Sequence, residues 1–279
     1  MDGHGATIHR LEHQGDVVQV LQITDTHLCR ERGGTLLGMD TDHSLQAVID
    51  LVKQERGDID VLLATGDLSD GGAEQAYRRL QEYFTQFECA KFWLTGNHDE
   101  RVAMESVVGN SASLSREIRI GGWQILMLDS QVNGEVGGGL GAAELAFLET
   151  SLEAAKADGL HTLVCLHHHP VEIGCEWLDE QMVSDANAFF SVLEKYPGAR
   201  GVLWGHVHQQ IDRQHQGLSL MASPSTCVQF APGSVGFKAD DLPPGYRWLE
   251  LHPDGSIRTG ISRVWDVAFN VELDSGGYL

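Results

Sequence analysis

The sequence predicts an α/β fold, because six short apolar segments alternate with amphipathic helical segments along its first two-thirds. Each apolar segment is rich in Val, Ile and Leu, which is typical of strands that are covered on both faces of a sheet. The six predicted strands are VVQVLQIT (17–24), IDVLLAT (59–65), KFWLT (91–95), WQILMLD (123–129), HTLVCLHH (161–168) and ARGVLWG (199–205).

The helices are predicted from apolar residues that recur every three or four positions, which places them on one helical face. Residues 42–57 show the pattern most fully, with Leu45, Val48, Ile49 and Val52. Three further helices carry the stripes Tyr77, Leu80, Phe84; Leu145, Leu148, Leu152; and Phe189, Val192, Leu193, Tyr196.

After Gly205 the segments become shorter and are separated by turn residues, which favours antiparallel sheet, and Asp254-Gly255 predicts a tight hairpin. The glycine-rich segment 132–141 predicts a surface loop before a helix. A phosphate-binding loop is the alternative, but the sequence lacks the G-x-x-x-x-G-K-[ST] pattern. We expect an N-terminal extension over residues 1–16 and a single domain over residues 17–279.

The composition narrows the classes of partner. The formal net charge of −21 opposes binding to duplex nucleic acid, although bound metal ions can still attract a small anion. No apolar run is long enough to span a bilayer, so we expect no membrane partner. The five scattered cysteines form no C-x-x-C pair and predict no disulfide framework, so a cytoplasmic location is expected. The oligomeric state stays open.

Polar residues follow the predicted strands at the points where the strands end. Because ligands bind beyond the carboxyl ends of strands in α/β sheets, we expect these residues to converge in space. Gly66, Gly96 and Gly205 stand beside them and would let the chain turn sharply. The converging residues are Asp25, His27, Asp67, Asn97, His98, His167, His206 and His208.

This set of residues predicts a metal centre. Oxygen and imidazole donors without a thiolate favour Mn, Fe or Zn. Seven donors exceed what one ion usually takes from protein, whereas two ions sharing a carboxylate use them naturally and can clamp a phosphoryl group. Singly, DTH, GD, GNHD and GHVH are ordinary capping or turn sequences. Their conjunction, each at a strand end, favours one site.

The pattern D-x-H, G-D-x-x-D, G-N-H-[DE], H and G-H-x-H resembles the calcineurin-like metallophosphoesterases, and this chain meets it in full. Within them it is most similar to the bacterial class III 3′,5′-cyclic AMP phosphodiesterases. The segments that carry this closer resemblance, which extends from Val17 to the C-terminus, are LQITDTHL, TLLG, LDSQV, LHHHP, GCEWLD and PSTCVQF.

The resemblance implies a four-layer α-β-β-α sandwich of two mixed sheets and a role for each motif residue. One metal would be held by Asp25, His27 and His208. The other would be held by Asn97, His167 and His206, with Asp67 bridging. His167 is chosen over His168 and His169 because it comes first after the strand. Fe and Mn are the usual ions of the family, and the donors also permit Zn.

The implied reaction is hydrolysis of cyclic AMP to the 5′-nucleotide by a hydroxide that bridges the metals, with His98 unligated and protonating the leaving oxygen.

Asp70 and Asp99 are expected either to orient histidines or to cap loops. Residues 223–230 are either part of the base pocket or an ordinary strand and turn, and Cys227 faces either substrate or core. The expected substrate contacts are His27, Asp67, Asn97, His98 and His208.

Two alternatives to this reaction remain open at this point. The same metal site can serve a phosphatase or a phosphodiesterase acting on another small phosphoester. The fold can also persist as a non-catalytic scaffold when the site degenerates, although every expected ligand is present in this chain.

Overall fold

Two mixed β-sheets face each other through an apolar layer in the computed structural model, which describes residues 8–277. The seven-stranded sheet has the order β1 (Ile8–Leu11), β7 (Glu117–Ile120), β8 (Trp123–Met127), β9 (His161–Cys165), β10 (Ala199–Trp204), β12 (Leu218–Ala222) and β11 (Ile211–His215). The five-stranded sheet has the order β16 (Ile257–Arg263), β15 (Gly245–Leu251), β2 (Val18–Ile23), β5 (Val61–Thr65) and β6 (Ala90–Leu94).

The strands that precede the predicted site run parallel to one another within each sheet. In the five-stranded sheet, β2, β5 and β6 are parallel, and β15 is antiparallel to both β2 and β16. In the seven-stranded sheet, β8, β9, β10 and β12 are parallel. The carboxyl ends of β2, β5 and β6 therefore share one edge, as do those of β9 and β10.

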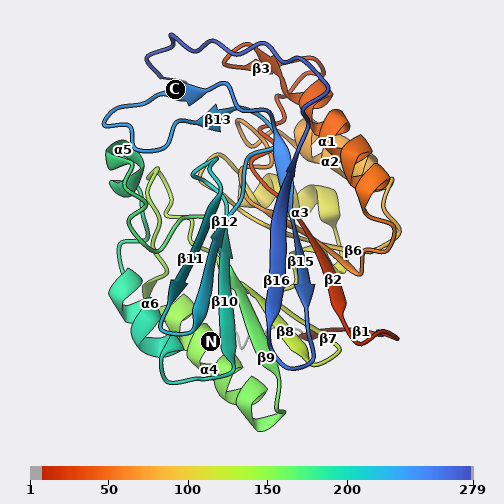
Figure 1. Cartoon of the computed structure of the whole chain (residues 1–279), viewed down its shortest axis with the longest axis vertical. Coiled ribbons are helices and arrows are strands. Elements are labelled where there is room, and N and C mark those ends of the chain that lie inside the picture. Colours follow the sequence, from red (N-terminus) through yellow and green to blue (C-terminus); the bar gives the residue numbers. More distant parts are fainter. Residues whose placement is uncertain (1–7, 278–279) are drawn as a thin grey trace.

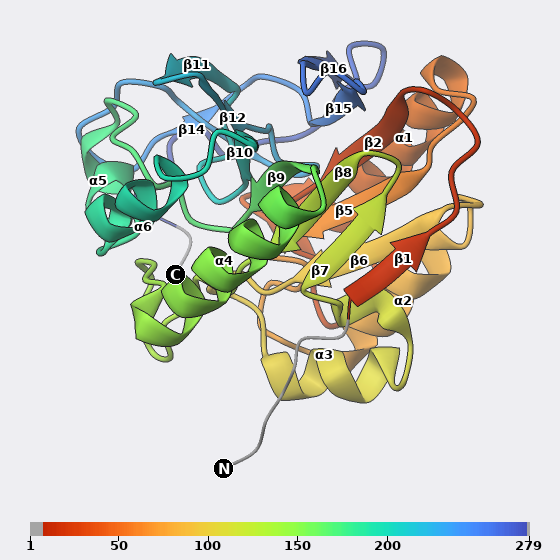
Figure 2. The ribbon, with the colours of Figure 1, turned by 90° about the horizontal axis from the view of Figure 1, so that it is seen from below.

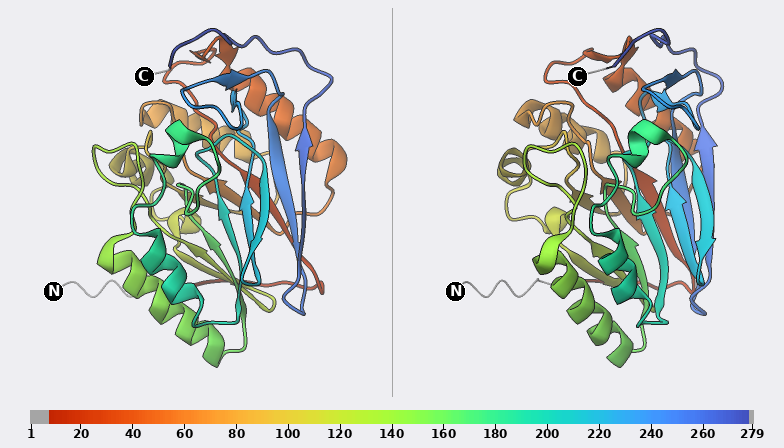
Figure 3. Two further views of the ribbon diagram at one scale, coloured as in Figure 1. Left: turned by 60° about the vertical axis from the view of Figure 1, so that its left-hand side comes forward. Right: turned by 90° about the vertical axis from the view of Figure 1, so that its left-hand side faces the viewer.

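Helices cover the outer face of each sheet and complete four layers. Helices α1 (Thr41–Glu55), α2 (Glu74–Phe84) and α3 (Arg101–Val108) pack against the five-stranded sheet. Helices α4 (Gly141–Ala157), α5 (Glu176–Asp179) and α6 (Ala186–Leu193) pack against the seven-stranded sheet. Figures 2 and 3 show α4 and α6 side by side, on the opposite side of the sheets from α1. The predicted sandwich is confirmed.

The layer between the sheets is built from every second residue of the facing strands. Val20 and Leu63 of one sheet meet Ile125, Leu163 and Leu203 of the other. The alternate residues of the same strands, such as Leu62 and Val164, face the helices. Because both faces are covered, these strands are nearly continuous apolar runs, which explains why the sequence predicted all six of them.

The sequence did not predict β1 or α3. β1 lies within the expected N-terminal extension, residues 1–7 of which are outside the described residues, and it pairs parallel to β7 at the sheet edge. Its sequence, Ile8 to Leu11, contains His9 and Arg10 and is only partly buried, so it carries no apolar run. The domain boundaries stay a prediction.

The C-terminal third contains the expected antiparallel pairs. β11 pairs with β12, and β15 and β16 form a hairpin whose turn contains Gly255 with φ 82°. Two short ribbons, β3–β4 (Thr35–Leu36, Met39–Asp40) and β13–β14 (Gln229–Phe230, Ala239–Asp240), lie toward the upper end in Figure 1. The tail packs there, where Glu272 N donates to Leu37 O at 2.8 Å. Among residues 8–277, no helix combines the length and apolar content needed to span a membrane.

Candidate metal centre

The backbone holds five of the predicted ligands in the left-handed region, which non-glycine residues seldom occupy. Their φ angles are 54° at Asp25, 42° at His27, 49° at Asp67, 65° at His206 and 48° at His208. Asp and His tolerate this conformation better than most residues, but it still costs free energy and is typical of functional sites.

The loops after β2 and β5 fix one another by backbone hydrogen bonds. The Asp25 N–H donates to Gly66 O at 3.0 Å, and the His27 N–H donates to Asp67 O at 2.9 Å. The two ligand loops are thus joined directly beyond the ends of their strands, which explains how the unusual φ angles are maintained.

The first cluster consists of Asp25, His27 and His208, whose ligand atoms lie within 4.8 Å of one another. His208 Nδ1 donates to Val228 O at 2.7 Å, which leaves its Nε2 without a proton in the neutral ring. That Nε2 lies 3.4 Å from Asp25 Oδ1 and 3.2 Å from His27 Nε2. His27 Nδ1 lies 3.4 Å from Asp70 Oδ1.

The second cluster contains His167 and His206, with Asn97 beside them. His167 Nδ1 donates to Thr65 O at 2.8 Å, and its Nε2 faces the interior of the site. His206 Nδ1 lies 3.1 Å from Asn97 Oδ1. The Nε2 atom of His206 is buried and makes no hydrogen bond, whereas the buried Nε2 of His167 faces the Asp67 carboxylate.

Asp67 lies between the two clusters. Its Oδ2 is 3.1 Å from His167 Nε2 and 3.8 Å from His27 Nε2, so it reaches toward both. Its Oδ1 accepts a hydrogen bond from His98 N at 2.9 Å. The structure therefore brings all seven predicted ligands into one region, together with His98.

These residues fit a pair of cations. At 3.2 Å, His27 Nε2 and His208 Nε2 repel each other unless a proton or a metal cation lies between them. The Asp25 and Asp67 carboxylates are almost completely buried, and buried charges are normally paired or bound to metals. The buried Nε2 of His206 makes no hydrogen bond and, in the neutral ring, is in the form that binds a metal.

The protonation of the site depends on burial and on Asp67. Burial lowers the pKa of His27 and holds the pKa of His206 well below its ordinary value. Burial also disfavours a charged His167, but the Asp67 carboxylate outweighs this and raises the pKa of His167 to about 9. Burial opposes ionisation of Asp67, yet His167 and His98 hold its pKa well below the usual range. Metal binding at His167 must therefore displace a proton.

The neighbouring histidines of the HHHP segment have other contacts. His168 uses both ring nitrogens, with Nδ1 2.8 Å from Ser130 Oγ and Nε2 3.1 Å from Val136 O. Burial lowers its pKa to about 3, so it stays neutral. The His169 ring stacks on His206 with centroids 5.8 Å apart. This geometry favours His167 as the ligand of the three.

The three glycines make room for the ligands. A Cβ atom at Gly96 would collide with the Asp67 carboxylate and His167, and one at Gly205 would collide with Thr24 and Asp25. Only Gly66, with φ 96°, also needs the conformational freedom of glycine. The sharp turns expected at Gly96 and Gly205 are therefore not the main reason for glycine there.

Asp99 and Tyr77 connect the ligand loops after β5 and β6. The Asp99 carboxylate accepts hydrogen bonds from Leu68 N, Ser69 N and Gly96 N, at 2.9 to 3.1 Å. The Tyr77 hydroxyl donates to Asp99 Oδ1 and accepts from Glu100 N, both at 2.9 Å. Asp99 is thus a loop-capping residue, whereas Asp70 orients the histidines.

Residues 223–230 pack against two of the predicted ligands, Asp25 and His208. Ser225 Oγ donates to Asp25 O at 2.6 Å, and the Phe230 ring stacks on His208 with centroids 4.1 Å apart. The whole segment is buried, and Cys227 packs with Leu36 and Met39. The base-pocket interpretation of this segment is therefore not supported, and Cys227 faces the core. The sequence alone contains no signal for the contact between Phe230 and His208.

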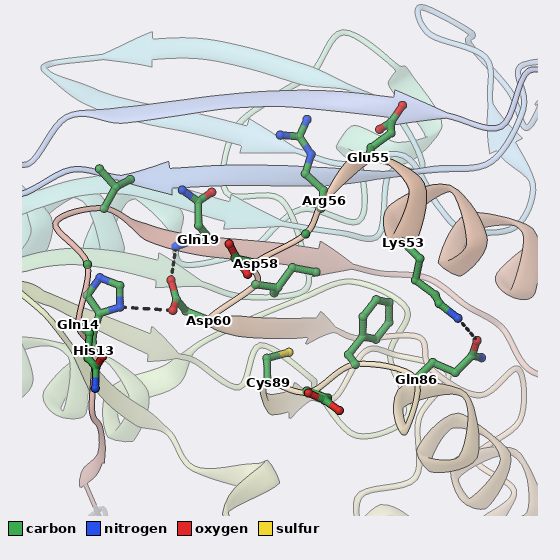
Figure 4. A pocket seen from close by; sticks show the side chains of 16 residues that line it. His13, Gln14, Gln19, Lys53, Glu55, Arg56, Asp58, Asp60, Gln86 and Cys89 are labelled. Atoms are coloured by element: carbon green, nitrogen blue, oxygen red, sulfur yellow. Dashed lines mark hydrogen bonds and ion pairs between the residues drawn. The ribbon is translucent and has the colours of Figure 1, made fainter.

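A cavity of about 1190 Å³ lies at the amino ends of β2, β5 and β6, away from the ligands (Figure 4). Two pairs of its polar side chains contact each other, with His13 3.3 Å from Asp60 and Lys53 3.4 Å from Gln86. None of the predicted ligands lines it. We therefore place the chemistry at the histidine cluster and not in this larger cavity.

The sequence profile of the family described as Calcineurin-like phosphoesterase matches residues 18–210. The chain belongs to this family. Among solved structures, it is similar to the purple acid phosphatase PPD1 from yellow lupin, with a TM-score of 0.64, 13% identity, and coverage of 92% of this chain and 53% of that one. At that identity the likeness concerns the fold alone.

Two relatives are much closer in sequence. The chain is 46% identical to the 3′,5′-cyclic adenosine monophosphate phosphodiesterase CpdA of Pseudomonas aeruginosa, covering 94% of this chain and 95% of the relative. It is 42% identical to the protein of the same name from Escherichia coli K12, with the same coverage of both chains.

Proposed function

We propose that this chain is a 3′,5′-cyclic AMP phosphodiesterase that produces 5′-AMP at a two-metal centre. The convergence of the two ligand clusters on Asp67 carries the proposal, because that arrangement suits a phosphoryl group held between two cations. The two relatives at 46% and 42% identity support cyclic AMP as the substrate.

The proposed division of the ligands between two ions follows the family resemblance, and the cluster of Asp25, His27 and His208 supports one half of it. Asp25, His27 and His208 would hold one ion, and Asn97, His167 and His206 the other, with Asp67 reaching both. Two such ions, when bound, acidify a water molecule and neutralise charge on the phosphate. We propose Fe, Mn or both, with Zn as the alternative, because the donors are oxygen and imidazole without a thiolate.

His98 is the proposed acid for the leaving oxygen. Its backbone N–H is tied to Asp67, and its Nδ1 donates to Asp70 O at 3.2 Å, which orients the ring beside the cluster. Its side chain is 14% exposed, so it can reach substrate. As the bond from phosphorus to the 3′ oxygen breaks and the new bond from phosphorus to the water oxygen forms, a proton from His98 would pass to the 3′ oxygen.

The remaining predicted substrate contacts surround the same point. His27 and His98 lie edge to face with ring centroids 4.9 Å apart, so the acid stands directly beside the first cluster. Asn97 adjoins His98 in the chain and approaches the second cluster through His206. We propose that His27, Asp67, Asn97 and His208 position the phosphate between the clusters while His98 faces the leaving group.

Product analysis with four substrates tests this function. The protein, supplemented with Mn or Fe, is assayed with cyclic AMP, cyclic GMP, p-nitrophenyl phosphate and bis-p-nitrophenyl phosphate, and nucleotides are separated by chromatography. We expect 5′-AMP from cyclic AMP. Activity on the monoester alone would indicate a phosphatase, and no activity on any of the four would indicate a scaffold.

We also propose that the protein acts in the cytoplasm. All five cysteines lie in the described part of the chain and are free thiols, as a reducing compartment would keep them. The small-molecule substrate and the net charge of −21 both argue against duplex nucleic acid as a partner.

A further inference from the structure

A cavity of about 710 Å³ opens directly beside the candidate metal centre, at Asn97 and His98. Its size lies within the roughly 300–1,000 Å³ typical of small-molecule sites. One wall is formed by Gly71 and Gly72. Another is formed by residues 131–136 (the 131–136 loop). The cavity is therefore continuous with the proposed acid, but it extends beyond anything that a phosphate group would fill.

The 131–136 loop brings two valines to this cavity, together with the polar side chains of Gln131, Asn133 and Glu135. Val132 and Val136 both line it and are 37% and 42% exposed. The chain is strongly acidic, so two exposed valines next to an ionic centre suit a ligand with an apolar face. Asn133 lies between them on the same loop and adds a carboxamide, which can both donate and accept hydrogen bonds.

Hydrogen bonds at both ends of the 131–136 loop connect it to the ligand-bearing segments. Gln131 Nε2 donates to Gly96 O at 2.9 Å and to Asp99 O at 2.7 Å. At the other end, His168 Nε2 donates to Val136 O at 3.1 Å. The wall of the cavity is thus formed in advance and placed relative to His98, which reduces the entropy lost on binding.

We propose that this cavity binds the nucleoside part of the cyclic nucleotide, an inference that rests on the proposed function. The purine packs against Val132 and Val136, and the ribose lies at His98 with its 3′ oxygen toward the acid. Asn133 is placed to read the base edge, because a carboxamide can pair with N6 and N7 of adenine.

A second cavity, of about 420 Å³, is formed by residues 231–238 and includes the exposed Val235. None of the predicted ligands lines it, and neither does His98. A base bound there would have no direct connection to the proposed acid, so the observations favour the cavity at the 131–136 loop.

Calorimetric titration of two ligands tests the assignment without relying on turnover. The Mn-supplemented protein is titrated with 5′-AMP and, separately, with inorganic phosphate, which shares the phosphate but lacks the nucleoside. In the double variant Val132→Ser/Val136→Ser, we expect the Kd of 5′-AMP to rise about tenfold through lost apolar contact. We expect the Kd of phosphate to stay within about twofold of wild type, since phosphate makes no contact with this surface.

Val235→Ser is the matched control, since it makes the same exchange at an exposed valine of the other cavity, and it should leave both Kd values unchanged. An unchanged Kd of 5′-AMP in the double variant overturns the assignment. An equal rise in the Kd values of 5′-AMP and phosphate in the double variant overturns it as well. A rise in the Kd of 5′-AMP in Val235→Ser also overturns it. If wild type hydrolyses cyclic AMP in these cases, only the subsite is wrong. If it hydrolyses other esters but not cyclic AMP, the proposed function is wrong too.

Discussion

The substitution Gly96→Ala should remove metal from the protein while leaving its fold in place. Gly96 does not have a positive φ, so alanine is conformationally acceptable there. The added Cβ would, however, stand 2.7 Å from His167 Nε2 and even closer to the Asp67 carboxylate. The perturbation therefore falls on two proposed ligands, one of which is the bridge, and on the backbone N of Asp67.

The magnitude follows from these contacts. Ordinary van der Waals contact begins at 3.4 Å, so the His167 ring has to recede by about 0.7 Å, and Asp67 has to move further. Metal sites tolerate departures of only about 0.2 Å in ligand distance. Disturbing the residues that place a ligand typically costs about 10- to 100-fold in metal affinity. The accompanying overpacking should lower the free energy of unfolding by about 1–3 kcal/mol.

Two assays separate the effects. Metal content is measured by atomic emission after dialysis, and the free energy of unfolding is measured by urea titration. Gly122→Ala is the control, because a Cβ there meets no atom within 4 Å and the residue lacks a positive φ. If Gly96→Ala retains as much metal as Gly122→Ala and wild type, the reasoning about ligand crowding is refuted.

Three further substitutions test separate parts of the site. His98→Ala should lower kcat for cyclic AMP by about 10²- to 10⁴-fold with metal content intact, and a loss of metal would contradict its role as an unligated acid. Asp67→Ala should reduce the content of both metals together by atomic emission, and full occupancy would rule out a bridge. Tyr77→Phe should lower the free energy of unfolding in urea by about 1–3 kcal/mol, because Glu100 N loses its acceptor, and an unchanged midpoint would contradict this.

The convergence of the ligand set could be predicted from sequence because the end of each apolar run marks the end of a buried strand. Asp25, Asp67 and His167 each follow an apolar run, and parallel strands bring such positions to one edge. His98 could be placed in the same way through its neighbour Asn97. The division of these residues into two clusters came from the family resemblance alone, and their roles as ligands stay predictions.

The supporting residues could not be predicted because their contacts depend on tertiary geometry. Asp99 caps the loop after β5 from the turn after β6, a relation set by how the two loops approach each other. Phe230 reaches His208 across the fold from a segment whose sequence resembles an ordinary strand. β1 was not predicted because its partly buried position at the sheet edge requires no apolar run.

An anomalous diffraction measurement on crystals of the Mn-loaded protein tests the two-metal centre most directly. We predict two peaks, one among Asp25, His27 and His208 and the other among Asn97, His167 and His206, with Asp67 coordinating both. A single peak, or two peaks that Asp67 does not join, would contradict the account.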